Sequence, residues 1–346
     1  MYYYNMRIEH DTKYDFCDVL IKPRISNLYS RNQIDLVRNI YFPNSKVSWS
    51  GIPIIASNMD TIGTYEVYKV LSKHKMVTAF HKFYNVDDYL NMEDLDSNYF
   101  MVSTGINNDD FNKLTDIINK IEVKFICIDV ANGYMNNLVK FCRRVRELYP
   151  NKVIIAGNVV CGDITNKLIN EGSVDIVKVG IGPGSACTTR IKTGVGMPQL
   201  SAIDDCSKAA HLHNKFVIAD GGITCPGDLG KAFGAGADFV MMGGIFSGHD
   251  ENPGEIIEED GNKYKLFYGM SSSKAMMKHY GKINNYRTSE GRVLKVKYKG
   301  SLDNTIRDYL GGLRSTGTYI GCDSIEYFKL CCNFVKVNKQ YNNMLC

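Results

Sequence analysis

Long apolar runs, clustered charges and paired cysteines are all missing from this chain of 346 residues. No apolar stretch approaches the roughly 18 residues needed to cross a bilayer, so we expect no membrane span. The formal net charge is only +4 and the Lys and Arg residues are scattered, which argues against nucleic-acid and membrane partners. Eleven cysteines occur, but no Cys-x-x-Cys pair, which argues against a disulfide framework or a zinc site.

Targeting signals are also lacking at both ends. The segment MYYYNMRIEH has no basic stretch followed by an apolar core, and the ending NNMLC has no cysteine four residues from its end. We therefore expect a cytoplasmic (cytosolic) protein whose cysteines are mostly small, buried hydrophobic residues kept in the reduced state.

The chain does contain a regular repeat of short apolar segments. They are rich in β-branched residues and begin near residues 53, 76, 99, 123, 152, 174, 215 and 238. Most are separated by segments with helical periodicity, such as TYEVYKVLSKH. Runs that are apolar on both faces are typical of parallel strands covered by helices. Eight such units favour an α/β fold, a (β/α)8 TIM barrel, over an open doubly wound sheet.

This pattern predicts a single TIM-barrel catalytic domain over residues 1–346, with barrel strands at about 53–243. Residues 1–52 and 244–346 are expected to pack onto the barrel, the latter as a long C-terminal extension. In that extension Asp260-Gly261 predicts a type I′ hairpin turn. An extended glycine-rich loop, GIGPGSACTTRIKTGVGMPQ, follows the sixth strand, and loops of this length are usually functional.

In a barrel of this class, the chemistry lies at the carboxyl ends of the strands. This rule alone selects the following residues as candidates: Asn58–Asp60, Asp129–Gly133, Gly157–Val159, Gly180–Arg190, Asp220–Ile223 and Gly243–Gly244.

The glycine-rich loop presents one thiol, Cys187, flanked by hydroxyl side chains and by Arg190. Its pattern does not fit a dinucleotide fingerprint, because Pro183 and the absent helical periodicity oppose a helix start, and a phosphate loop would need Gly-Lys-Ser/Thr. A cation and loop amides near a sulfur stabilise the thiolate, so we predict that Cys187 is a nucleophile. The seven histidines show no metal-ligand spacing, and we expect them to be solvated or satisfied in the core.

Three glycine-rich motifs near the last strands, ADGGIT, MMGG and YGMSSS, predict a phosphate cradle. Each alone could be a tight turn, but three at neighbouring strand ends favour a ligand. Asp220 would repel a phosphate, so it is expected to accept hydrogen bonds from sugar hydroxyls.

Together these motifs resemble the inosine-monophosphate dehydrogenase / guanosine-monophosphate reductase superfamily, from about residue 15 to about 335. The resemblance rests on GIGPGSACTTRIKTGVGMPQL, ADGGI, MMGG, YGMSS and NYRTSEG. The segments KTGVGMPQL and TIRDYLGGLRSTGTYIG are similar to the reductase branch, and no regulatory insertion separates strands two and three. The dehydrogenase flap with its Arg-Tyr pair has no obvious counterpart. Gly317 departs from the reductase pattern, which has cysteine there.

The resemblance implies NADPH-dependent reductive deamination of GMP to IMP with release of ammonia, a step of purine nucleotide salvage. Cys187 would attack purine C2 to form a covalent thioimidate adduct. Thr189 and Glu290 would help to protonate the leaving ammonia. Two other functions stay open: an IMP dehydrogenase that converts IMP to XMP with NAD, and a non-catalytic purine-nucleotide-binding barrel.

The resemblance also implies three sets of binding residues and a homotetramer with its cofactor site near a subunit interface. The residues implied for GMP or IMP are Asp220, Gly221, Gly222, Gly243, Gly244, Gly269, Met270, Ser271, Arg287, Ser289 and Gly291. Those implied for NADPH are Ser30, Arg31, Lys82, Asp129, Val130, Ala131, Ile181, Gly182, Met270, Tyr286, Arg287, Ser315, Thr316, Gly317 and Thr318, the last four reaching over from a neighbouring subunit. Those implied for a monovalent cation, K⁺, are Gly182, Gly184, Cys187 and Arg190.

Overall fold

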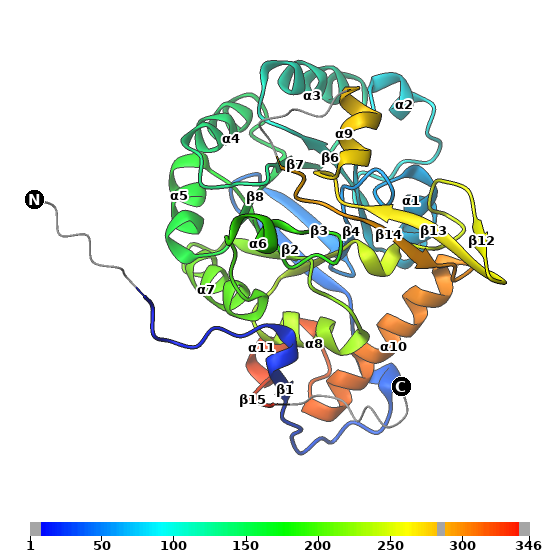
Figure 1. Ribbon diagram of the computed structural model, residues 1–346. Helices are drawn as coiled ribbons and strands as arrows, with labels where there is room; N and C mark the ends of the chain where they lie inside the picture. Colours follow the sequence, from blue (N-terminus) through cyan, green and yellow to red (C-terminus); the bar gives the residue numbers. More distant parts are fainter. Residues whose placement is uncertain (1–7, 282–287, 339–346) are drawn as a thin grey trace, which may run out of the picture.

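The computed structural model describes residues 8–281 and 288–338. Eight parallel strands close into a barrel in the order β10-β11-β4-β5-β6-β7-β8-β9 (Figure 1), which confirms the predicted TIM barrel. Each strand begins within two residues of a predicted segment. Their bounds are β4 (Ile54–Ala56), β5 (Val77–Phe80), β6 (Phe100–Thr104), β7 (Phe125–Asp129), β8 (Val153–Val159), β9 (Ile176–Val179), β10 (Phe216–Asp220) and β11 (Phe239–Met242).

The strands alternate with helices that form the outer layer of the barrel (Figure 1). In α3, Phe111, Leu114 and Ile117 form the buried stripe, and the Asn107 side chain caps the first turn by accepting from the Asp110 amide. The helices that follow the first seven strands are α1 (Tyr65–Leu71), α2 (Val86–Leu90), α3 (Asn108–Lys120), α4 (Asn136–Leu148), α5 (Gly162–Gly172), α6 (Thr189–Thr193) with α7 (Gln199–His211), and α8 (Pro226–Gly234).

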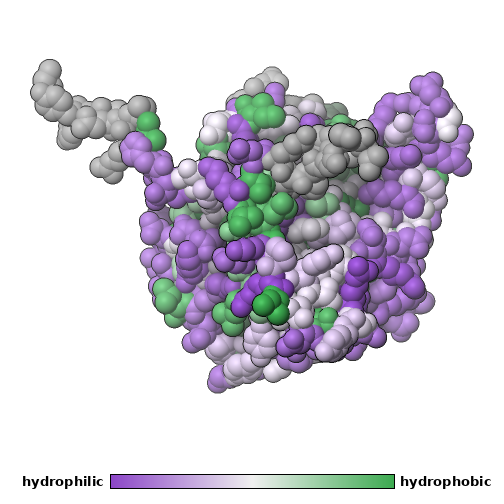
Figure 2. Space-filling model, turned by 90° about the horizontal axis from the view of Figure 1, so that it is seen from below, coloured by the Kyte–Doolittle hydropathy of each residue, from purple (hydrophilic) through white to green (hydrophobic). Residues whose placement is uncertain are grey.

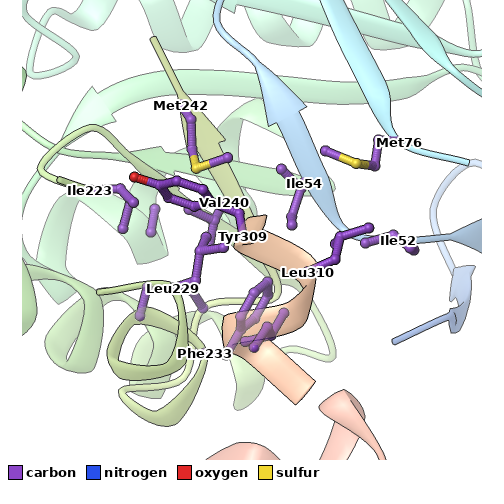
Figure 3. Packing of buried hydrophobic residues seen from close by; sticks show 14 of the residues in the cluster. Ile52, Ile54, Met76, Ile223, Leu229, Phe233, Val240, Met242, Tyr309 and Leu310 are labelled. Carbon is purple, nitrogen blue, oxygen red and sulfur yellow. The ribbon is translucent and has the colours of Figure 1, made fainter. Parts of the chain in front are cut away.

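The eighth position of the helix ring is filled by α10 (Leu302–Ile320), which contacts both α8 and α1. Figure 3 shows Tyr309 and Leu310 of α10 in one apolar cluster with Leu229 and Phe233 of α8 and Val240 of β11. The C-terminal extension therefore supplies the element that closes the layer around the barrel.

Between β11 and α10 the chain forms an antiparallel sheet of β12 (Ile257–Glu259), β13 (Asn262–Tyr268) and β14 (Val293–Lys297), with α9 (Ser273–Tyr280) after β13. Asp260 and Gly261 both have positive φ, at 49° and 75°, as the predicted type I′ turn requires.

Two further pairs of strands lie outside the barrel sheet. The hairpin β2 (Arg38–Phe42) and β3 (Val47–Gly51) packs Phe42 and Trp49 into the same apolar cluster as the barrel side chains Ile55 and Phe239. The strand β1 (Val19–Ile21) pairs with β15 (Phe334–Lys336), which follows α11 (Phe328–Cys331). The face at the bottom of Figure 1, seen in Figure 2, carries separate apolar groups among hydrophilic residues.

Two sequence expectations need correction. The loop after β9 is not free of helix, because Thr189–Thr193 form the short α6, which ends at Gly194 in the left-handed conformation. Fewer cysteines are buried than expected, because half-buried positions next to loops and helix caps accommodate a thiol equally well. Among the described cysteines, the buried ones are Cys127, Cys142, Cys206 and Cys322, whereas Cys17 is exposed. None of the described helices is long and apolar enough to span a membrane.

Buried carboxylates join neighbouring strands at the amino end of the barrel. Asp238, just before β11, accepts from the amide of Val217 in β10 at 2.9 Å, and from Arg38 and His211. Asp175 makes the equivalent contact ahead of β9, accepting from the amide of Ile154 at 2.9 Å. Burial opposes the ionisation of Asp238, but His211 and Arg38 outweigh it and hold its pKa below the usual value.

Replacing Asp238 by Asn is therefore expected to lower the free energy of unfolding at pH 7 by about 3–5 kcal/mol, because Arg38 is left buried without its anionic partner. Because the pKa of Asp238 is lowered in the folded protein, the difference in unfolding free energy between wild type and variant has its full size above about pH 4. It shrinks as the pH falls further and Asp238 becomes protonated. Urea unfolding of both proteins across this pH range measures it.

The matched control is Asp204→Asn, which removes an exposed ion pair with Lys208 on α7 and should change stability by less than about 1 kcal/mol. Equal effects of the two substitutions would contradict the structural role of Asp238.

Candidate active site

A pocket of about 280 Å³ opens at the carboxyl ends of the barrel strands. Its lining follows β4, β7, β8, β9, β10 and β11, as the strand-end rule predicts. Many residues of the predicted substrate, cofactor, cation and catalytic sets line this pocket. They are Asp129, Val130, Ala131, Ile181, Gly182, Gly184, Cys187, Thr189, Asp220, Gly221, Gly222, Gly243, Gly244, Gly269, Met270, Ser271 and Glu290.

Cys187, Thr189 and Glu290 form a continuous hydrogen-bonded chain in this pocket. The Cys187 thiol donates to Thr189 Oγ1 at 3.2 Å, and the Thr189 hydroxyl donates to Glu290 Oε2 at 2.7 Å. All donors point the same way, from the half-buried thiol toward the carboxylate. The chain therefore offers a proton a path between sulfur and carboxylate.

Backbone pairing explains how Glu290 reaches a thiol about a hundred residues earlier in the sequence. The Thr188 amide donates to the Glu290 carbonyl at 2.9 Å, and the Arg292 amide donates to the Ala186 carbonyl at 3.0 Å. Cys187 thereby lies antiparallel to Gly291. These backbone hydrogen bonds hold the two segments together, so the loop that carries Cys187 is anchored to the segment that carries Glu290.

Arg190 braces the loop that carries Cys187. Its guanidinium donates to Asp15 Oδ2 at 2.9 Å and to the Met197 carbonyl at 2.5 Å. Gly182, at φ +84°, must be glycine here, because a Cβ would lie 2.5 Å from Arg190 Cγ. The carboxylate of Asp15 is the charge partner of Arg190.

The predicted phosphate motifs pack against the nucleophile loop. Gly221 has φ +83°, and a Cβ on it would lie 3.2 Å from the Gly184 amide nitrogen. A Cβ on Gly244 would lie 2.6 Å from the Ser185 hydroxyl. The left-handed backbone at Gly221 favours glycine, and a side chain at Gly244 would displace the Ser185 hydroxyl, so both turns stay open toward a ligand.

A charged cluster forms the floor of the pocket, and sequence analysis missed its centre, Lys178. Its ammonium donates to Asp129 Oδ1 at 2.9 Å, lies 2.7 Å from Asp220 Oδ2 and donates to Asn158 Oδ1 at 3.1 Å. Burial alone would lower the pKa of Lys178, but the two carboxylates raise it above its usual value. The one available signal was a charged residue inside the otherwise apolar strand IVKV.

The comparisons with known proteins agree with this geometry. A family model described as "IMP dehydrogenase / GMP reductase domain" matches residues 13–342. The chain belongs to this family. It is 52% identical over 343 residues to GMP reductase 1 of Homo sapiens, covering 98% of this chain and 99% of that protein. It is 54% identical over 342 residues to a GMP reductase of Buchnera aphidicola, with 97% and 98% covered, and 50% identical over 343 residues to that of Caenorhabditis elegans, with 98% and 96% covered.

Other residues that the family resemblance implied lie around the pocket or apart from it. Ser289 Oγ donates to the Ser271 carbonyl at 3.2 Å, which places it beside the cradle. Lys82 lines a neighbouring cavity of about 320 Å³ that shares Asp129, Val130, Ala131, Met270 and Ser271 with the first. Tyr286 and Arg287 lie outside the described residues.

The remaining predicted cofactor residues lie outside the lining of both cavities. The 3₁₀ helix Arg31–Gln33, capped by Ser30, packs against α10, which carries Ser315, Thr316, Gly317 and Thr318. None of these residues, all within the described part of the chain, lines either cavity.

A cluster around Asp60, one of the strand-end candidates, supports the pocket wall, although the sequence analysis did not foresee its partners. Asp60 Oδ2 accepts from Tyr268 at 3.0 Å and from Lys278 at 2.8 Å, lies 2.6 Å from His279 Nε2, and the Asp60 amide contacts Met270 Sδ at 3.4 Å. The ring of His279 stacks on Phe83. This histidine is satisfied, as expected, and among the described residues no cluster of three His, Cys, Asp or Glu could hold a metal.

The brace on the nucleophile loop can be tested by Asp15→Ala, which removes the acceptor of both Arg190 and the Gln199 amide. We expect amide hydrogens of residues 184–197 to exchange about tenfold faster or more, while the barrel strands stay protected. Hydrogen–deuterium exchange with mass spectrometry measures this.

Glu9→Ala is the control, because Glu9 pairs with Lys13 at the surface. Unchanged exchange in the loop, or faster exchange throughout the barrel, would show that Asp15 does not brace the loop.

Proposed function

We propose that this protein catalyses the NADPH-dependent reductive deamination of GMP to IMP with release of ammonia. The observation that carries the proposal is the hydrogen-bonded chain from Cys187 through Thr189 to Glu290, in a pocket lined by glycine turns. The relatives named GMP reductase, about half identical over nearly the whole chain, support the same activity.

GMP would bind with its phosphate against the turns at Gly221–Gly222, Gly243–Gly244 and Gly269–Ser271, which line the pocket. Asp220 would accept hydrogen bonds from the ribose hydroxyls. Asp220 Oδ2 is already bonded by Asn158 at 2.8 Å, so Oδ1 can serve the ligand. The purine would then face Cys187.

The residues of the chain account for the proton movements of this reaction. Cys187 attacks C2 of the purine, and its proton passes through Thr189 to Glu290 along the existing hydrogen bonds. The same path returns a proton to the amino group, which leaves as ammonia. Bound NADPH would supply the hydride to C2. Release of the Cys187 thiolate then gives IMP.

The cofactor would lie across the second half of the pocket, between Asp129–Ala131 and Lys82. Ser30, Arg31, Ser315, Thr316 and Thr318 are far from this position in their own chain, so they would reach it from a neighbouring subunit of a homotetramer. The exposed side chains of Ile25 and Tyr29, 99% and 94% accessible and next to the end of α10, support an interface there.

Gly317 is buried within that helix. A Cβ there would lie 2.9 Å from both the Cys322 carbonyl and Ile34 Cγ2, so glycine suits this packing where the reductase pattern has cysteine. The neighbouring hydroxyl side chains would therefore make the cofactor contacts.

A monovalent cation, K⁺, would bind to the carbonyl oxygens of Gly182, Gly184 and Cys187. Carbonyl oxygens are ligands that such cations take, and the Cys187 amide donates to the Gly184 carbonyl at 2.9 Å, so the loop turns tightly here. A guanidinium cannot ligate a cation, so Arg190 would act by bracing the loop.

An assay of absorbance at 340 nm tests the proposed activity. Wild-type protein should consume NADPH when GMP is present, whereas Cys187→Ala should abolish this turnover and leave GMP binding, measured by calorimetry, largely intact. Cys225→Ala, at the N-terminus of α8, is the matched control and should stay active. NADH formed from IMP and NAD, with no reaction of GMP, would instead identify a dehydrogenase, and binding without turnover a nucleotide-binding protein.

Glu290→Gln tests the proton path. It preserves shape but cannot deliver a proton, so GMP turnover should fall by about 10²–10⁴-fold. Single-turnover NADPH formation from IMP and NADP⁺ should fall by much less, because the thiol can also lose its proton to solvent.

Glu259→Gln, in an exposed ion pair with Lys295, provides the control for the charge change. An equal loss in both reactions of Glu290→Gln would mean that Glu290 positions a ligand and does not relay a proton.

A further inference from the structure

A single buried ammonium connects two carboxylates that line different parts of the pocket. Lys178 in β9 contacts Asp129 at the end of β7 and Asp220 at the end of β10, at 2.9 and 2.7 Å. The side chain of Lys178 is only 4% exposed. Asp129 borders the neighbouring cavity with Lys82, whereas Asp220 faces the glycine turns.

Two amides complete this cluster and restrict its geometry. Asn58 Nδ2 donates to Asp129 Oδ2 at 2.9 Å, and Asn158 Nδ2 donates to Asp220 Oδ2 at 2.8 Å. Asn158 Oδ1 also accepts from Lys178. Each carboxylate is therefore held by the ammonium and by one amide, which fixes its orientation in the pocket.

The neighbouring strand leaves room for Lys178. A Cβ on Gly157 in β8 would lie 2.6 Å from Lys178 Cβ and 2.3 Å from its carbonyl oxygen, so any side chain there would displace the lysine. The cluster is thus built into the barrel wall and is not a chance surface pairing.

We propose that Lys178 is a positioning residue that joins the substrate half and the cofactor half of the pocket. Its ammonium orients Asp220 toward the hydroxyl groups of GMP and Asp129 toward those of the dinucleotide. This inference rests on the proposed function, which assigns the two halves.

Electrostatics explains why one cation has to serve both carboxylates. Without Lys178, two carboxylates would face each other in a partly desolvated pocket, and repulsion would turn them away from their ligands. Burial alone would lower the pKa of Lys178, but both carboxylates raise it, so the group stays protonated and is not a general base. The other charged or ionisable groups near the cluster are Lys82, beside Asp129, and the buried thiol of Cys127.

Lys178→Met tests the proposal. We expect KM for both GMP and NADPH to rise at least tenfold, with a smaller change in kcat, since the catalytic chain of Cys187 is not touched. Lys178→Arg keeps the positive charge with a different geometry, so it should raise the KM values for GMP and NADPH less than Lys178→Met does. This variant can replace Lys178→Met in the test if the methionine variant folds poorly. Unchanged KM values in both variants would overturn the proposal.

The matched control is Lys215→Met. Lys215 is also a buried barrel lysine facing an aspartate, Asp175, but at the amino end, 3.8 Å away. Lys215→Met should leave the KM values for GMP and NADPH within about twofold of those of the wild type. If Lys215→Met raised them as much as Lys178→Met, the effect would be general destabilisation and the proposal would be wrong.

A charge rescue separates positioning from packing. In Lys178→Met combined with Asp129→Asn, Asp220 no longer faces a second carboxylate, so GMP affinity should recover several-fold from that of Lys178→Met alone. Calorimetric GMP titration measures this without any turnover, and no recovery would overturn the proposal. Absence of GMP reduction by the wild type, with these binding changes intact, would instead refute the assigned activity.

Discussion

Closure of the barrel between β11 and β4 is the constraint on which the rest of this protein depends. Once Val240 pairs with Ile54, all eight carboxyl ends meet around one axis. Segments that are far apart in sequence, such as those at Ser57 and Met242, whose amide and carbonyl are 2.9 Å apart, are then brought together. Because an open sheet would leave β11 and β4 apart, the glycine turn at Gly243–Gly244 could not share one pocket with Ser57–Met59 without closure.

Much of this arrangement could be predicted from the sequence because it depends on local patterns. The eight apolar segments, the Asp260-Gly261 turn and the strand-end rule all led to elements that the structure contains. Cys187 was selected for the same reason, as a thiol in a glycine loop that follows a strand. These signals need only a residue and its near neighbours.

Long-range pairings could not be derived in this way. Lys178 was hidden in a strand that otherwise looks fully apolar, and its partners lie about forty to fifty residues away on either side. Arg190 was considered only with its neighbours in the sequence, whereas its carboxylate partner, Asp15, lies 175 residues away. Glu290 was named through the family resemblance alone, since nothing in its local sequence shows that it would meet Thr189.

The pairing of β1 with β15 has a consequence for the order in which the molecule can be assembled. Asp15, which braces the nucleophile loop, lies four residues before β1, and β1 completes its pairing with a strand near the opposite end of the chain. During synthesis the first of these segments emerges from the ribosome when the other has not yet been made. The segment that follows the brace at Asp15 therefore completes its strand pairing only after residues 334–336 have been made.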